Sequence, residues 1–171
     1  MPATPEYLAR IKQHAEGKDP LPLQRETPVA LEALIRHAPA EKLTTRPAEN
    51  KWSIAEILAH LAEDEIATAW RYRQMAEHSG IELPGFDQDL WARMGVYADR
   101  SPADSLALFR LLRQANLQFL EHLAPEQWNY FGEHEERGRI TISSWLPTWW
   151  AMMRITSNRF SGSSPETSSS A

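Results

Sequence analysis

The chain has 171 residues, of which 42% are hydrophobic and 24% charged, and these values are ordinary for a globular protein. This length suits one domain, or one domain with tails, and is enough to bury a core. The net charge of −5 and the lack of a basic cluster argue against a nucleic-acid partner. The absence of cysteine excludes disulfides and thiolate chemistry and suits a cytoplasmic protein. We find no signal peptide and no apolar run that could span a bilayer, so no membrane partner is expected.

The first third of the chain predicts one modest helix between less regular segments. Residues 1–22 mix a short amphipathic piece with proline and glycine, which predicts a loosely attached arm or a short first helix. Thr27 and Pro28 have the form of an N-cap followed by a proline in the first turn. We therefore expect a helix that begins there and ends near Pro39. The polar segment 40–50 is predicted to be a loop.

The strongest helix signal lies between Lys51 and Met75. Ser53 and Glu56 have the spacing of a capping box, in which each side chain bonds to a backbone N–H of the first turn. Apolar residues then recur at spacings of three and four and form one stripe along the helix. These features predict a helix over residues 53–79, around which the rest of the chain is organised.

Three polar residues on this helix are candidates for a functional role. Glu65 lies near the centre of the apolar stripe, where a carboxylate is costly unless it has a partner. It is expected either to orient His60 or a bound water, or to form a structural ion pair. His60 and Asp64 lie four residues apart at the edge of the stripe, so both can point into a groove between helices. The arginines that could pair with Glu65 are Arg71, Arg73 and Arg113.

The middle of the chain predicts a turn, a short helix and a second strong helix. Pro84 and Gly85 mark the turn, and residues 87–94 are predicted to be a short helix whose Leu90 and Trp91 face inward. The sequence S-P-A-D at residues 101–104 combines a cap, a first-turn proline and an acid, and predicts a helix that ends near residue 123. Asn116 interrupts its apolar stripe. Either it bonds to Glu65 or Asp64, or it is a solvated edge position.

The last third predicts a linker or hairpin over residues 126–139 and a final apolar stretch from Thr141, which Pro147 interrupts. The Ser-rich segment 157–171 is expected to be a disordered tail. Residues 23–156 would then form one domain. About four main helices with short or medium connections predict an all-α fold, an antiparallel up-down four-helix bundle.

The pattern W-S-x-x-E-x-x-x-H-x-x-x-x-E at residues 52–65 resembles that of the DinB-like superfamily of four-helix bundles. The S-P-A-D helix start and the G-x-I-T-I segment at residues 138–142 add to this resemblance. It implies a divalent metal, often nickel or zinc, held by three histidines, of which His60 matches the first. The other two come from an H-D-x-x-H motif on the last helix. At family level it implies a metal-dependent enzyme of the thiol-transferase or hydrolase type.

The chain lacks that second motif, because no histidine follows His134. His60 is therefore the single predicted metal ligand, and we name no catalytic or cofactor-binding residue. We expect the metal to be absent or weakly bound and the chain to be inactive, with its substrate unknown. The alternative is a non-enzymatic helical bundle that binds a small ligand or dimerises, with a homodimer among the expected partners.

A shift of the reading frame by one base offers one explanation for the missing motif. Trp and Met each have a single codon, so a shifted frame fixes several residues: Trp149-Trp150 gives Val, and Met152-Met153 gives Asp. With permitted alternatives, the shifted stretch from residue 144 reads L-A-x-H-M-V-G-H-D-A-x-H-L, which contains H-D-x-x-H. We hypothesise that the gene, or its recorded sequence, carries a frameshift near codon 144. The alternative is a natural divergent C-terminus in which the same Trp and Met residues pack the core.

Overall fold

The computed structural model describes residues 20–49 and 51–145. Three predicted segments lie outside the described residues: the arm up to residue 19, the Ser-rich tail, and the stretch of the frameshift hypothesis beyond its first residue, Trp145. No helix among the described residues is long and apolar enough to cross a membrane.

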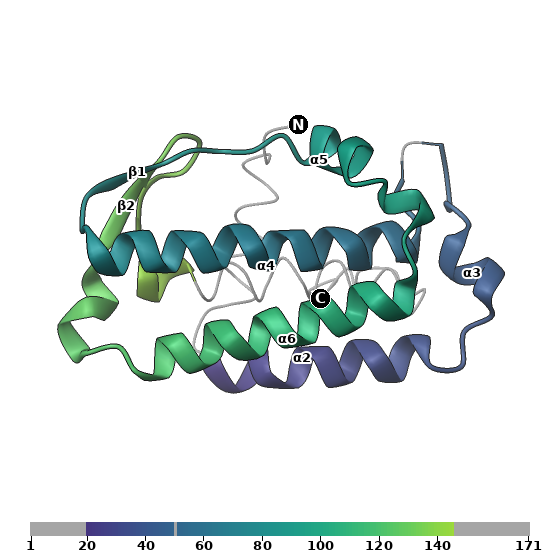
Figure 1. Ribbon diagram of the computed structural model, residues 1–171, viewed down its shortest axis with the longest axis horizontal. Coiled ribbons are helices and arrows are strands. Elements are labelled where there is room, and N and C mark those ends of the chain that lie inside the picture. Colours follow the sequence, from purple (N-terminus) through teal and green to yellow (C-terminus); the bar gives the residue numbers. More distant parts are fainter. Residues whose placement is uncertain (1–19, 50, 146–171) are drawn as a thin grey trace, which may run out of the picture.

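Three long helices build the described part of the bundle: α2 (Pro20–Ile35), α4 (Ile54–Glu77) and α6 (Pro102–Glu121) (Figure 1). Contacts between α4 and α6 advance together along both helices, from Glu65 with Arg113 to Arg73 with Phe119, so these two helices run parallel. The chain is helical again from Ile142 to the last described residue. The predicted all-α bundle is confirmed. The parallel pair is a feature that the sequence did not predict.

The start of α2 corrects the expected helix boundary. Helix α2 begins at Pro20 and continues through Pro28, where the sequence predicted a first turn. Proline has no N–H, so the carbonyl of Gln24 loses the donor that a helix normally supplies four residues later. Arg113 Nη1 donates to that carbonyl at 3.2 Å. A residue on another helix thus supplies the missing donor, which the local sequence could not reveal.

The connection from α2 to α4 contains a short helix, α3 (Ala40–Thr44), where a loop was predicted. None of its residues is buried, so it contributes little to the core. The predicted capping box at the start of α4 is confirmed: Ser53 Oγ accepts from Glu56 N at 3.2 Å, and Glu56 Oε2 accepts from Ser53 N at 2.8 Å. Arg46 pairs with the same carboxylate and ties this connection to α4.

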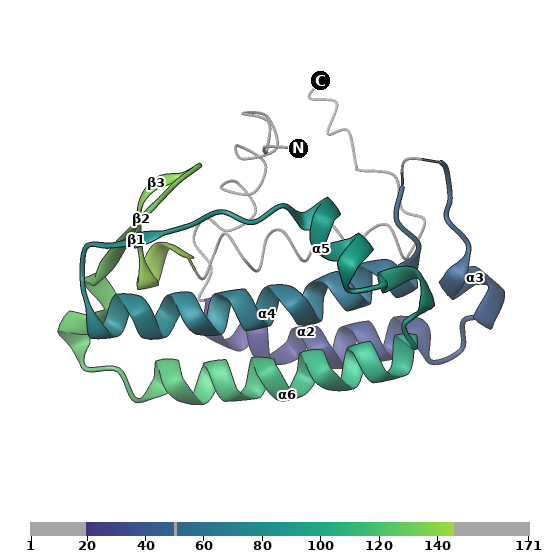
Figure 2. The same cartoon turned by 45° about the horizontal axis from the view of Figure 1, so that its top comes forward.

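The chain returns along α4 before α6 begins, as Figures 1 and 2 show. This return contains β1 (Ile81–Leu83), α5 (Gln88–Met94) and the 3-10 helix η1 (Tyr97–Asp99). The short helix α5 was predicted, but Leu90 does not face inward, because it is 42% exposed. Trp91 is half-buried and stacks on Phe86 with ring centroids 4.3 Å apart.

A small sheet closes one end of the bundle. After the 3-10 helix η2 (Pro125–Asn129), β2 (Phe131–His134) and β3 (Gly138–Thr141) form the predicted hairpin. Strand β1 pairs with β2 in parallel, with Ile81 opposite Gly132. This strand was not predicted. Its pairing brings the end of α4 beside the hairpin, where a second apolar cluster forms around Tyr72, Met75 and Ile142.

Candidate functional site

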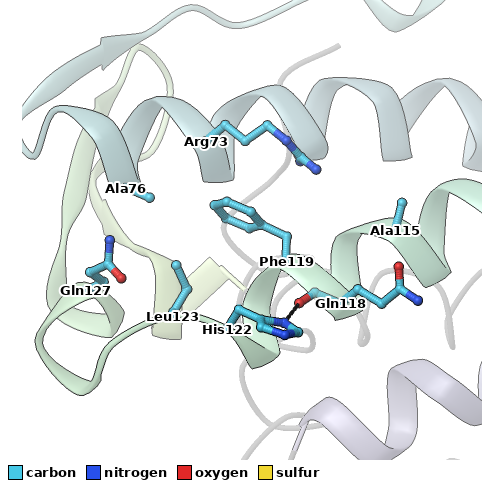
Figure 3. A pocket seen from close by; sticks show the side chains of 8 residues that line it. All are labelled: Arg73, Ala76, Ala115, Gln118, Phe119, His122, Leu123 and Gln127. Atoms are coloured by element: carbon cyan, nitrogen blue, oxygen red, sulfur yellow. Dashed lines mark hydrogen bonds between the residues drawn. The ribbon is translucent and has the colours of Figure 1, made fainter.

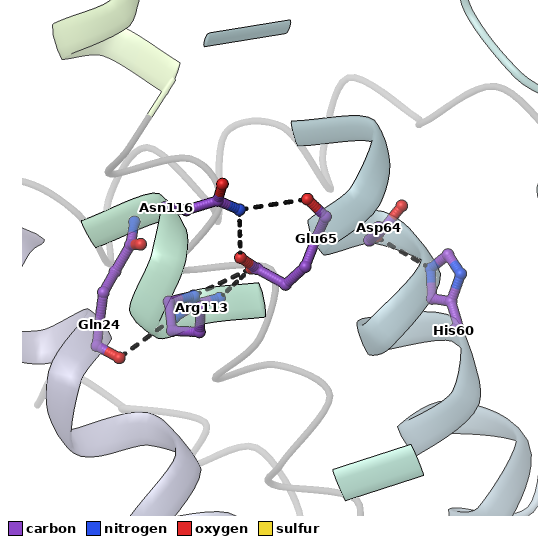
Figure 4. A network of polar contacts seen from close by, with 6 residues as sticks. All are labelled: Gln24, His60, Asp64, Glu65, Arg113 and Asn116. Carbon is purple, nitrogen blue, oxygen red and sulfur yellow. Dashed lines mark hydrogen bonds and ion pairs between the residues drawn. The ribbon is translucent and has the colours of Figure 1, made fainter. Parts of the chain in front are cut away.

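Glu65 lies at the centre of a buried polar network that joins α2, α4 and α6 (Figure 4). Glu65 and Arg113 have side chains only 1% exposed, and Glu65 Oε1 accepts from Arg113 Nε at 2.9 Å and from Nη2 at 2.6 Å. Asn116 Nδ2 donates to Glu65 Oε2 at 2.9 Å and to its backbone carbonyl at 3.2 Å. Of the predicted alternatives for Glu65, the structure confirms the ion pair with Arg113. Asn116 bonds to Glu65, as one of its predicted alternatives stated.

His60 and Asp64, which lie four residues apart, form a separate pair on another side of α4. His60 Nε2 lies 3.3 Å from Asp64 Oδ2. The ring of Trp52 meets the imidazole edge-on at 4.8 Å, and the ring of Tyr97 lies 6.4 Å away. His60 Nδ1 is buried and has no hydrogen-bond partner among the described residues. When Nε2–H faces the carboxylate, Nδ1 keeps a lone pair that could bind a metal.

The surroundings of Asp64 are buried and contain charged groups of both signs. Asp64 is 7% exposed, and this burial raises the pKa of its carboxyl group, as does the negative charge of Glu65. His60 and the guanidinium groups of Arg71 and Arg137 act in the opposite direction. Burial also lowers the pKa of Arg71, because the charged form loses hydration. Two arginines close to the only carboxylate of the pair oppose the binding of a metal cation there.

A cluster that the sequence did not predict continues from this pair toward the sheet. The guanidinium carbon of Arg71 lies 5.5 Å from the Phe86 ring and 5.2 Å from the Trp145 ring, and Arg71 Nη2 donates to the Pro84 carbonyl at 3.0 Å. His134 stacks on Trp145 at 5.8 Å. Burial, followed by Arg71 and Arg137, lowers the pKa of His134. The sequence placed these residues in separate segments, and β2 (Phe131–His134) has no apolar alternation that could have indicated that His134 is buried.

The side chains around His60 can provide one metal ligand, His60 itself, and a carboxylate that supports it. They cannot provide a complete metal-binding site. Stable catalytic zinc sites use three protein ligands and an open position. In residues 20–49 and 51–145, no group of three histidine, aspartate or glutamate side chains is placed to hold a metal ion. The sequence adds no histidine after His134. We therefore derive no chemical step through a metal in this chain.

The comparisons with known proteins agree with this architecture. The model of the DinB superfamily matches residues 24–150. Among solved structures, the fold is similar to that of YfiT from Bacillus subtilis, described as a probable metal-dependent hydrolase with an unusual four-helix bundle topology. The two chains share 18% sequence identity, the match covers 94% of this chain and 91% of that chain, and the TM-score is 0.75. No curated protein matches the chain significantly.

Proposed function

The chain belongs to the DinB superfamily, and from this premise we propose that it is a member with an incomplete metal site and little or no metal-dependent activity. His60 is the retained ligand in this proposal, and Asp64 is its supporting carboxylate. The reaction that this chain would no longer catalyse is of the hydrolase or thiol-transferase type, with nickel or zinc as the metal. The description of YfiT as a probable metal-dependent hydrolase supports this reaction class.

One observation carries the proposal. The described residues around the buried pair of His60 and Asp64 supply no third ligand, and the positive charges of Arg71 and Arg137 act on the Asp64 carboxylate. A single imidazole with one carboxylate binds divalent metal weakly compared with a three-ligand site. The additional positive charge weakens it further.

Metal content of the purified chain tests the proposal. The protein is incubated with Ni²⁺ or Zn²⁺, dialysed, and analysed for metal per chain, alongside His60→Ala. We expect far less than one metal per chain and no difference between the two proteins. Stoichiometric metal that His60→Ala loses would overturn the proposal.

An altered gene tests the frameshift hypothesis directly. The coding sequence is changed by one base near codon 144 so that the shifted frame is translated. We expect this chain to take up about one metal, as a three-ligand site requires, and to lose it when His60 is also replaced by Ala. If DNA sequencing finds that no one-base change encodes H-D-x-x-H, the hypothesis fails while the weak-site proposal stands.

A second candidate function is a non-enzymatic bundle that forms a homodimer, and exposed apolar side chains favour it. On the parallel helices α4 and α6, Ile66 is 44% exposed, Trp70 45% and Leu111 66%. Large exposed apolar side chains on neighbouring helices are typical of an interaction surface. Sedimentation velocity tests this candidate: Trp70→Glu should convert a dimer to a monomer. A monomer in the unaltered protein would reject it.

A further inference from the structure

A groove of about 530 Å³ lies between the C-terminal halves of α4 and α6 (Figure 3). At about 100° per residue, Arg73 lies roughly half a turn around α4 from Asp64, so this groove is on the other side of the helix from the His60 pair. Its volume is within the range of about 300–1,000 Å³ that small-ligand sites occupy. The groove is lined by Arg73, Ala76, Ala115, Gln118, Phe119, His122, Leu123 and Gln127.

The lining combines an apolar floor with cationic and amide groups and contains no carboxylate. Ala76, Phe119 and Leu123 provide the floor, and Arg73 provides a permanent positive charge. The charged lining of the groove is therefore positive, whereas the chain as a whole has a net charge of −5. A ligand that matches it has an apolar body and one negative charge.

Arg73 is held in place by the buried network. Asn116 uses its amide Nδ2 on Glu65, which directs its Oδ1 toward Arg73 Nη1 at 3.3 Å. The same Nη1 donates to the Ala69 carbonyl at 2.9 Å, and the guanidinium carbon lies 4.7 Å from the Phe119 ring. Both hydrogen bonds of Arg73 to described residues use Nη1, so its Nε and Nη2 groups have no partner there. A guanidinium positioned in this way has donors left for a carboxylate.

His122 provides a second oriented polar group at the edge of the groove. Its Nδ1 lies 2.7 Å from the Gln118 carbonyl, which can only accept, so Nδ1 carries the hydrogen and donates. Nε2 is therefore the ring atom that remains for a ligand. Figure 3 shows His122 and Gln118 on one side of Phe119 and Arg73 on the other.

We propose that this groove is a binding site for a small carboxylate with an aromatic or aliphatic body. The carboxylate pairs with Arg73, and the apolar body covers Phe119 and Leu123. The site uses none of the residues assigned to the metal position, so it does not depend on whether His60 binds a metal.

Titration of the full ¹⁵N-labelled chain with 2-naphthoate tests this site, with the neutral 2-naphthamide as a matched ligand. We expect saturable amide shifts at the groove residues for 2-naphthoate and at least tenfold weaker binding of the amide. Arg73→Gln should weaken 2-naphthoate binding by roughly tenfold, the usual effect of losing one charge-assisted hydrogen bond. It should leave 2-naphthamide binding unchanged.

Arg110→Gln is the matched control, because Arg110 is exposed on α6, pairs with Glu32 on α2 and does not line this groove. It should bind 2-naphthoate as the unaltered chain does. Equal affinity of Arg73→Gln and the unaltered chain would overturn the proposal. Equal affinity for the acid and the amide, or shifts confined to other surfaces, would do the same.

Discussion

The loss of Arg113 should be among the most destabilising single changes in the described residues. Its guanidinium donates to the carboxylate of Glu65 and to the carbonyl of Gln24, and it is 1% exposed. Arg113→Ala would leave a buried carboxylate without its counter-charge and a helix carbonyl without a donor. Removing one partner of a buried ion pair typically costs about 3–5 kcal/mol.

For a domain of this size, a loss of 1 kcal/mol lowers Tm by about 2–4 °C, so we expect a decrease of roughly 6–20 °C. Urea and thermal unfolding followed by far-UV circular dichroism measure both quantities. Arg36→Ala is the control, because its ion pair with Glu32 is exposed and worth at most about 1 kcal/mol. If Arg113→Ala changes the unfolding free energy by no more than this control, the assigned role of the network is wrong.

Pro28→Ala separates the two roles of Arg113. Alanine restores an N–H that can reach the Gln24 carbonyl within α2. This substitution should therefore stabilise the Arg113→Ala chain more than it stabilises the unaltered chain. Equal effects in the two backgrounds would show that Arg113 does not supply the donor missing at Pro28.

Three further changes test local features. Ser53→Ala should lower the unfolding free energy by about 1 kcal/mol, because it removes the cap of α4, and urea unfolding measures it. Gly132→Ala should cost about 1–3 kcal/mol in the same assay, because a Cβ would lie 2.4 Å from Leu83 Cδ1; a cost near zero would contradict the close approach of β1 and β2. The pKa of His134 lies below its usual 6.5 in the folded chain, so the unfolded chain takes up the proton first and stability falls as pH decreases through 6.5. His134→Asn should therefore lose less unfolding free energy than the unaltered chain between about pH 7.5 and pH 5, and an equal loss would refute this assignment.

Helices α4 and α6 could be predicted from the sequence because their signals are local. The capping box at Ser53 and the S-P-A-D start at Ser101 each place a cap, first-turn acid and apolar stripe within a few residues. The four-residue spacing of His60 and Asp64 indicated for the same reason that the two side chains lie on one side of the helix. These features depend on the helical period and need no information from the rest of the chain.

The features that the sequence missed depend on partners far away in the chain. Pro28 indicated the start of a helix. Helix α2 accommodates this proline in its interior because Arg113 donates to the carbonyl group that Pro28 leaves without a donor. Strand β1 has only three residues and gains its partner from β2, so it carries no alternation of its own. Arg71 and His134 meet at Trp145 only after the return along α4 and the parallel strand pairing are formed.

The division of α4 into separate faces explains how such a chain could lose a metal site and keep its fold. Glu65 points toward Arg113 and Asn116 and holds three helices together, while His60 and Asp64 lie on another side of the helix. The apolar cluster that joins α2, α4 and α6 includes no described residue after Phe109. A change after residue 144 therefore replaces no member of this cluster, whereas it does replace Trp145 of the second apolar cluster. Restoring the shifted frame should therefore change metal uptake strongly, whereas Arg113→Ala should change stability strongly through a network that contains no residue of the shifted stretch.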